Sequence, residues 1–497
     1  MRRTIFALAV GLFAGLPAWA DWTPDIEAWN SPQPPQPGAV LVRNATIWTG
    51  GEAGILENAD LLVRNGRIAA VGQDLNAPRN AMEIDAEGKH VTPGIIDAHS
   101  HAAIIGGVNE GSRINTGDVR IRDVIDAESI NIYRQLAGGV TAINLLHGSA
   151  NAIGGQMAVI KMRWGAAPSE LIFEAAPEGI KFALGENPKQ SNWRSDTPRY
   201  PQTRLGVEQV IRELFEQAAD YRDAHENHPS GRAGRERVPP RPNHQLAAVA
   251  EVIHGERHVH SHTYRADETL ALMRIAEQFD FTIQAFHHAL EGYKIGPELA
   301  KHGASASVFI DWWAFKYEAI DGIGYNPALM HQAGTLTGLH SDNAELARRM
   351  NLEAAKAVRY GGVDPHVALQ MVTAFPADQL GIAHRTGRLE EGLDADFVIW
   401  SGHPLSVYTR AEQTWVDGRR YFDLEADQRM QAALAEEHAE LFALALDSDE
   451  PANSNDAAHG EEDDRSQRRR VASFATHLTG YRASELDHDE FCLLHDH

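Results

Sequence analysis

Short apolar runs alternate with helical patterns through most of this 497-residue chain, and this alternation limits the fold more than any other feature. One apolar stripe at helical spacing runs from Val207 to Tyr221, and another runs from Leu272 to Phe279. A chain of this kind forms a parallel sheet covered by helices, and eight strands indicate a (β/α)8 barrel. The candidate strands are residues 95–99, 140–146, 171–175, 180–184, 259–263, 282–288, 306–310 and 335–341.

A second set of strand patterns flanks this region on both sides. Residues 40–49 and 60–71 alternate in strand fashion, with turns at Gly50-Gly51 and Asn65-Gly66. Residues 396–400 and 414–421 have the same character, with a turn at Asp417-Gly418. We therefore predict a small β-sandwich made from both ends of the chain, residues 38–92 and 385–425, around a barrel of residues 93–384.

The two ends of the chain have compositions of their own. Residues 1–20 have the charged, apolar and Ala18-Trp19-Ala20 cleavage regions of a signal peptide, which predicts an exported, periplasmic or extracellular protein. Residues 21–37 are Pro-rich and predict an extended lead-in. Near the other end we expect an amphipathic helix at 426–446 and an acidic, largely disordered tail at 447–497.

Charge and cysteine content limit the partners and cross-links. The formal net charge is −24, and it becomes −26 once Arg2 and Arg3 are removed with the signal peptide. Nucleic acid and anionic membranes are poor partners for such a surface, and no segment of the mature chain predicts a membrane span. Cys492 is the single cysteine, so an intramolecular disulfide is impossible. These features leave small molecules as the expected partners, whereas the oligomeric state is undetermined.

The first candidate strand ends in paired histidines. Residues 91–102 read VTPGIIDAHSHA, and the two-residue period of a strand places His99 and His101 on one face. Two imidazoles at the end of a buried strand suit a divalent cation such as zinc. Working residues of parallel barrels lie at the carboxyl ends of the strands, so the pair is a candidate metal site.

This phrase resembles the first-strand signature of the metal-dependent amidohydrolase superfamily, P-G-[ILF]-[IV]-D-x-H-x-H. The similarity covers roughly residues 38–425 and is closest to secreted imidazolonepropionase-like and prolidase-like members. The resemblance implies a distorted barrel with a small β-sandwich, one or two divalent ions, and hydrolysis of a C–N bond.

The resemblance also implies the remaining metal ligands. Lys181, in an I-K strand, matches the lysine that is carboxylated in binuclear members, with Glu186 as an alternative carboxylate. His262 matches H-x-[YH]-R, and His260 is the alternative there, better explained as a core histidine. His288 matches H-x-x-E-G-Y. Because neighbouring strand residues point to opposite faces, His287 is expected to face the helices.

Asp342 completes the ordered series of predicted ligands at successive strand ends. A carboxylate beside a cation can bind it and can also take the proton that an attacking water loses, so we predict Asp342 as the catalytic acid–base. Alternatively, it is a helix N-cap. His340, two residues earlier, departs from the family pattern and is a candidate substrate contact, together with Arg265, Tyr293, Trp312 and Trp313. A small-residue loop at 151–156 is expected to approach a ligand.

Three functions fit these residues. The first is binuclear hydrolysis of an amide or dipeptide, which requires a carboxylated Lys181. The second is a mononuclear cyclic-amidine hydrolase or deaminase, which leaves Lys181 unmodified and uses His99, His101, one later histidine and Asp342. The third is a binding protein that kept the barrel and lost the chemistry, and the complete set of ligand types argues against it.

Overall fold

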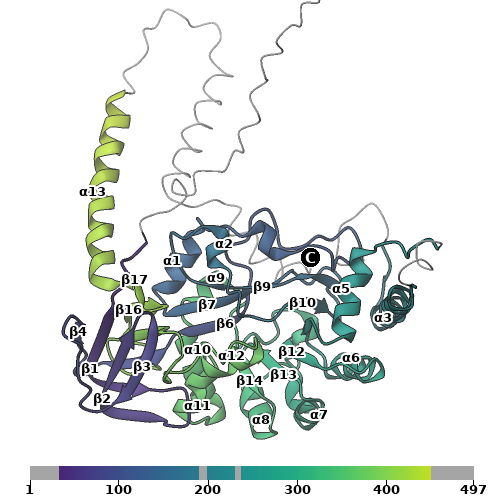
Figure 1. The fold of residues 1–497 in the computed structure, drawn as a ribbon, viewed down its shortest axis with the longest axis horizontal. Coiled ribbons are helices and arrows are strands. Elements are labelled where there is room, and N and C mark those ends of the chain that lie inside the picture. Colours follow the sequence, from purple (N-terminus) through teal and green to yellow (C-terminus); the bar gives the residue numbers. More distant parts are fainter. Residues whose placement is uncertain (1–32, 190–198, 230–236, 449–497) are drawn as a thin grey trace, which may run out of the picture.

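A computed structural model describes residues 33–189, 199–229 and 237–448. The predicted signal peptide, most of the predicted lead-in, and the tail beyond Ser448 lie outside the described residues. So does the middle of the Pro- and Arg-rich segment at 225–243. Within the described part, two strand-rich units lie side by side, and α13 (Leu424–Ser448) stands away from them (Figure 1).

The first unit is one eight-stranded sheet built from both ends of the chain. Its order is β17-β16-β15-β5-β1-β2-β3, with β4 paired to β1. The strands are β1 Ala39–Trp48, β2 Ile55–Arg64, β3 Arg67–Gly72, β4 Met82–Asp85, β5 His90–Pro93, β15 Phe397–Trp400, β16 Ala411–Val416 and β17 Arg419–Asp423. Antiparallel pairing of β5 with β15 joins the two distant segments. The sheet contains the predicted strand segments, whereas its packing as a two-layered sandwich stays a prediction.

The second unit is a barrel-like α/β arrangement with mixed sheets. One sheet has the order β14-β13-β12-β11-β10-β8, and the other has the order β6-β7-β9. The strands are β6 Ile95–Ser100, β7 Val140–Leu145, β8 Ile153–Gln156, β9 Ala158–Lys161, β10 Gly179–Ala183, β11 His258–Thr263, β12 Ile283–His288, β13 Ser305–Val308 and β14 Thr337–Leu339. All pairs are parallel except those that β8 and β9 make. Closure into one barrel stays a prediction.

Helices cover the outer side of these strands (Figure 1). They are α1 Ile130–Leu136, α2 Pro168–Leu171, α3 Arg204–Glu226, α5 His244–Ile253, α6 Ala266–Gln278, α7 Gly296–His302, α8 Asn326–Gln332, α9 Ala344–Ala347, α10 Met350–Gly361, α11 Pro365–Gln370 and α12 Ala374–Gln379. The two predicted stripes fall on α3 and α6. None of the helices in the described part of the chain combines the length and apolar character that crossing a membrane requires.

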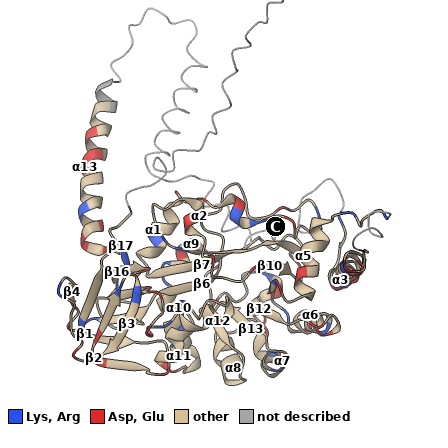
Figure 2. Ribbon diagram, viewed as in Figure 1, with Lys and Arg blue, Asp and Glu red and all other residues tan. Residues whose placement is uncertain are grey.

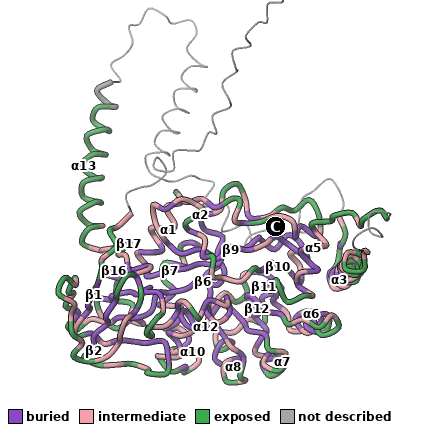
Figure 3. Tube along the Cα trace, viewed as in Figure 1, coloured by how far each residue is buried: buried purple, intermediate pink, exposed green. Residues whose placement is uncertain are grey.

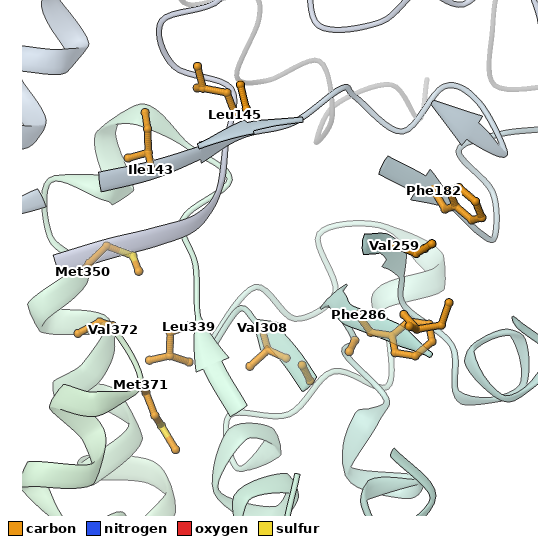
Figure 4. Close-up of a cluster of buried hydrophobic side chains, with 14 of the residues drawn as sticks. Ile143, Leu145, Phe182, Val259, Phe286, Val308, Leu339, Met350, Met371 and Val372 are labelled. Carbon is orange, nitrogen blue, oxygen red and sulfur yellow. The ribbon is translucent and has the colours of Figure 1, made fainter. Parts of the chain in front are cut away.

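One continuous apolar core lies between the strands and the helices. Phe182, Val259 and Phe286, from three consecutive strands, belong to the same buried cluster as Met350 and Met371 from the helix side (Figure 4). Figure 3 shows the strands of the second unit buried and the helices exposed on their outer faces, with α13 exposed over most of its described residues. Charged residues concentrate on the outer helices and loops, and α13 has more acidic than basic residues (Figure 2).

Two local predictions were wrong. Residues 171–175 are not a strand, because α2 begins at Pro168, where proline is favoured, and Glu170 accepts a hydrogen bond from Ala167 N. Residues 153–156 form β8 rather than a loop. A Cβ on Gly154 would lie 3.1 Å from the carbonyl oxygen of Lys181, so this glycine permits close approach to a neighbouring strand.

Candidate metal centre

The paired histidines of β6 lie next to Asp342. Both imidazoles are buried, and their Nε2 atoms are 3.3 Å apart. Asp342 Oδ1 lies 3.4 Å from His99 Nε2 and 3.2 Å from His101 Nε2. Three potential ligand atoms, from residues 243 positions apart in sequence, therefore converge on one point.

Two of the predicted ligands, Asp342 and His288, have an unusual backbone conformation at the strand ends. Asp342 has φ of 48° and His288 has φ of 69°, both in the left-handed region that non-glycine residues seldom occupy. Such strain persists where surrounding contacts hold it, and it concentrates at functional sites. Here Asp342 N donates to the carbonyl oxygen of His99 at 3.1 Å, which holds the end of β14 beside β6.

Lys181 lies inside the same cluster. Its side chain is fully buried on β10, and Nζ is 3.4 Å from His99 Nε2 and 3.4 Å from the carbonyl oxygen of His147. A buried lysine requires a partner or a modification. Its amine therefore occupies the position from which a carbamate could reach the ligands of β6.

His262 and His288 form the opposite side of the cluster. Their ring centroids are 4.7 Å apart, and His288 Nε2 lies 3.9 Å from Asp342 Oδ2. The buried Nε2 of His262 has no hydrogen-bond partner among the residues that the structure describes. A buried imidazole nitrogen without a hydrogen-bond partner is a donor atom suited to a cation.

The four predicted ligand histidines share one arrangement, in which Nδ1 is bonded to a neighbouring group. The Nδ1 partners are His287 Nδ1 at 3.1 Å for His99, Leu146 O at 2.9 Å for His101, Ser149 Oγ at 3.0 Å for His262 and His340 Nε2 at 2.9 Å for His288. Metal-binding histidines characteristically have such a partner on the second nitrogen. The Nε2 atoms of His99 and His101 lie on the side of Asp342, within 3.4 Å of its Oδ1.

Burial favours the neutral form of His99, His262 and His288, which is the form that binds metal. Burial, reinforced by the charge of Lys181, lowers the pKa of His99 well below its ordinary value. The pKa values of His262 and His288 are also lowered well below normal, again chiefly by burial. Nitrogen and carboxylate donors of this kind fit zinc or a similar divalent ion, so the residues fit the predicted metal.

The prediction that His287 faces the helices was wrong. The His287 ring lies among the cluster histidines, with Nδ1 3.1 Å from His99 Nδ1 and Nε2 3.0 Å from His260 Nδ1. Alternation points His287 inward, and the left-handed backbone of His288 then turns the next ring inward as well. His260 is thus a hydrogen-bonded core histidine, as expected, although it remains close to the centre.

His340 contacts two of the predicted ligands, His288 and His99. Its Nε2 bonds His288, its Nδ1 is 3.2 Å from Ser307 Oγ, and its ring stacks on His99 with centroids 5.1 Å apart. Phe309 stacks on His288 at 4.8 Å, and Trp312 stacks on Phe309 at 4.6 Å. Trp312 therefore belongs to an aromatic wall beside the cluster.

The other predicted substrate contacts lie further out. Arg265 pairs with Asp267 and lines a groove of about 540 Å³ between α3 and α6. Tyr293 donates its hydroxyl hydrogen to the carbonyl oxygen of Asp321. Trp313 is exposed beside Tyr360. Glu186 pairs with Lys189 at 2.8 Å and with Arg204 at 3.5 Å.

Sequence reasoning missed several supporting groups. Ser149 and the carbonyl of Leu146 come from the segment after β7 and have no motif of their own. Lys316 is buried over the ring of Tyr264, whose ring lies 4.6 Å from that of His262. A buried lysine is rare, and its burial is the feature that distinguishes Lys316. Because burial of a loop residue cannot be inferred from sequence, Lys316 was missed.

Comparison with known proteins gives consistent matches. A model of the Amidohydrolase family matches residues 314–428. The crystal structure of an amidohydrolase from Thermotoga maritima MSB8 is 32% identical, with a TM-score of 0.70, and covers 77% of this chain and 100% of that chain. The chain is therefore a member of the amidohydrolase family.

Curated relatives agree over part of their length. Amidohydrolase tasK of Hapsidospora irregularis is 33% identical over 427 residues, which is 77% of this chain and 43% of that protein. Imidazolonepropionase of Klebsiella pneumoniae is 37% identical over 136 residues, which is 22% of this chain and 33% of that protein. The chain thus spans less than half the length of these curated relatives.

Proposed function

We propose that this chain is a metal-dependent hydrolase that cleaves a C–N bond in an amide, a dipeptide-like compound or a cyclic amide. The supporting observation is that His99, His101, His262 and His288 each have Nδ1 bonded, and that Nε2 of His99, His101 and His288 lies 3.2–3.9 Å from an oxygen of Asp342. These residues and Lys181 would hold one or two divalent ions, which we propose to be zinc. A bound divalent ion would polarise the scissile carbonyl and lower the pKa of water.

The residues of the chain supply the proton transfers and the positioning. Asp342 accepts the proton of the attacking water and later returns it to the leaving nitrogen. Its left-handed backbone and the hydrogen bond from its amide to His99 hold the carboxylate beside the ligand pair. The wall of Phe309 and Trp312 keeps one side of the site apolar, which strengthens the electrostatic interactions of the carboxylate.

Two forms of the centre remain to be separated. In the binuclear form, the amine of Lys181 would add to CO2 and lose a proton, and the resulting carbamate would supply oxygen ligands to the ions. In the mononuclear form, Lys181 would stay unmodified. Metal content per chain, measured with the mass of the peptide that contains Lys181, distinguishes them. Two equivalents and a mass increase equal to CO2 indicate the binuclear form.

The same preparation tests the whole proposal. We expect one or two divalent ions per chain, and His99→Ala should remove most of the metal and the activity on a panel of N-acyl amino acids, dipeptides and cyclic amides. His384→Ala, at an exposed histidine, is the matched control. A chain without metal whose hydrolysis is insensitive to chelators would refute the proposal.

We also propose that the protein is exported. The support is the signal-peptide pattern of residues 1–20, with its Ala18-Trp19-Ala20 site. The mature N-terminus in the native host should be Asp21, as N-terminal sequencing would show. An intact Met1 on cytoplasmic protein would contradict export.

A further inference from the structure

Three buried imidazoles form a continuous chain that leads away from the candidate metal centre. His99 Nδ1 lies 3.1 Å from His287 Nδ1, and His287 Nε2 lies 3.0 Å from His260 Nδ1. All three side chains are fully buried. The chain crosses from β6 to β12 and β11, and its far end, His260 Nε2, has no hydrogen-bond partner among the described residues.

Such a chain admits two opposite directions of hydrogen bonding. A neutral imidazole has one donor nitrogen and one acceptor nitrogen, so fixing one ring fixes the next. If His99 carries its hydrogen on Nδ1, His287 must accept at Nδ1 and donate from Nε2, and His260 then carries its hydrogen on Nε2. If His99 carries its hydrogen on Nε2, all three rings are reversed. Only the first direction leaves His99 Nε2 able to bind a cation.

The neighbours of His99 make both directions accessible. His101 Nδ1 must donate to the carbonyl of Leu146, because a carbonyl only accepts, so His101 Nε2 is an acceptor. That acceptor lies 3.3 Å from His99 Nε2 and Asp342 Oδ1 lies 3.4 Å away, whereas Lys181 Nζ, a donor at 3.4 Å, favours the tautomer that accepts at Nε2. A hydrogen on His99 Nε2 therefore has partners, and a cation competes with it.

We propose that His287 and His260 are positioning residues of the metal centre, and that a cation on His99 sets their hydrogen-bond chain in the direction that leaves His99 Nε2 free. This inference rests on the proposed metal dependence and adds two residues to it. Reversal changes no net charge, because a proton leaves His99 Nε2 for solvent and another is taken up at His260 Nε2. In each of the two hydrogen bonds between the rings, the hydrogen moves from one nitrogen of the pair to the other.

The hydrogen-bond partner of His101 differs in kind from that of His99: it is a backbone carbonyl rather than an imidazole. A carbonyl partner holds one tautomer permanently, as Leu146 does for His101. An imidazole partner can donate or accept, so His287 supports His99 in either tautomer. The centre thus combines one ligand of fixed tautomer with one whose tautomer follows the cation.

Matched variants test the role of the His99–His287–His260 hydrogen bonds. The measurement is the Zn²⁺ affinity of the full-length protein, determined by competition with a chromophoric chelator. His287→Phe should weaken Zn²⁺ binding by about 10- to 100-fold, the usual cost of losing a group that orients a ligand. His287→Asn, which retains a polar atom near the position of Nδ1, should restore most of the affinity. His287→Gln, which retains one near Nε2, should restore little. His258→Asn, on the same strand as His260, is the control.

Nitrogen-15 NMR of ring-labelled protein reads the direction without any variant. On adding Zn²⁺, the Nε2 signal of His260 should change from the acceptor to the protonated type, and Nδ1 of His99 should do the same. Unchanged signals in a chain that binds Zn²⁺, or equal affinity of wild type and His287→Phe, would overturn this inference while leaving the metal centre intact. Failure of the wild type to bind Zn²⁺ would instead refute the proposed function and this inference with it.

Discussion

Asp97 and Ser341 are joined by two hydrogen bonds, which hold the segment after β14 beside β6. Ser341 N donates to Asp97 Oδ1 at 3.1 Å, and the Ser341 hydroxyl donates to Asp97 Oδ2 at 2.5 Å. Asp97 Oδ1 also accepts from His99 N at 3.2 Å. Because Asp97 precedes His99 and Ser341 precedes Asp342, this pair places the predicted acid–base beside the predicted ligands.

Loss of the Ser341 hydroxyl should therefore affect both stability and the site. Ser341→Ala leaves a buried carboxylate oxygen short of a donor, and we expect a loss of about 1–3 kcal/mol in the free energy of unfolding. A double-mutant cycle with Asp97→Asn, measured by urea denaturation, should show coupling between the two positions. Ser112→Ala, at an exposed serine bonded to Glu110, should change stability little. Strict additivity would contradict a direct interaction.

Asp342→Asn tests the acid–base role. Asparagine keeps the size and one oxygen but cannot accept the proton of the attacking water. Turnover of an identified substrate should fall by about a hundredfold or more, as expected for a general acid–base group. Metal analysis should find the ion at least partly retained, because the histidines remain. Near wild-type turnover with metal bound would exclude Asp342 as the base and direct attention to Lys181 or His340.

A buried ion cluster joins the two strand-rich units. Lys161, at the end of β9, lies 2.7 Å from Asp394 Oδ2 and 2.9 Å from Asp396 Oδ2, and it also contacts Asp417 of the β16–β17 turn. Lys161→Met leaves three neighbouring carboxylates without their shared cation. We expect destabilisation of about 3–5 kcal/mol in denaturant titrations. Lys301→Met, at an exposed lysine, is the control, and equal midpoints for both variants would argue against the cluster.

His147 should make stability depend on pH. Its Nδ1 bonds the carbonyl of Gly148, its Nε2 accepts from Glu110 N, and burial lowers its pKa to about 4. In the unfolded chain His147 binds a proton near pH 6.5, whereas in the folded chain it does so only near pH 4. The free energy of unfolding therefore decreases as pH falls from 6.5 toward 4. Between pH 7 and pH 5 this amounts to about 2 kcal/mol by linkage. His147→Gln should flatten this dependence in unfolding curves, whereas His384→Gln should not.

Periodic patterns in the sequence predicted most elements. Alternation predicted the segment of β1, and short apolar runs predicted those of β11 and β12. Helical stripes predicted α3 and α6, because burial of one helix face requires this spacing. The predicted C-terminal helix lies within α13. Short segments were less predictable. Residues 171–175 are apolar enough for a strand, yet Pro168 and the Glu170 cap favour a helical turn just before them.

The predicted ligands His99, His101, Lys181, His288 and Asp342 meet in the structure because the carboxyl ends of parallel strands share one edge. This convergence could be predicted from spacing and strand order. That His287 and His288 both face the centre could not be predicted, because the second inward ring depends on the left-handed backbone of His288. Asn44, Asp74 and other residues also adopt positive φ without any metal ligand nearby in sequence, so no local pattern signals it.

The sequence by itself determined which residue types stand at the strand ends and in what order, because side-chain periodicity follows directly from backbone geometry. Only the tertiary structure decided which group bonds Nδ1 of each predicted ligand histidine. That choice depends on groups distant in sequence, such as Leu146 O for His101 and His340 for His288. A hydrogen bond of about 3 Å depends on how strands pack against one another, and packing at that precision is set by the whole core rather than by any local pattern.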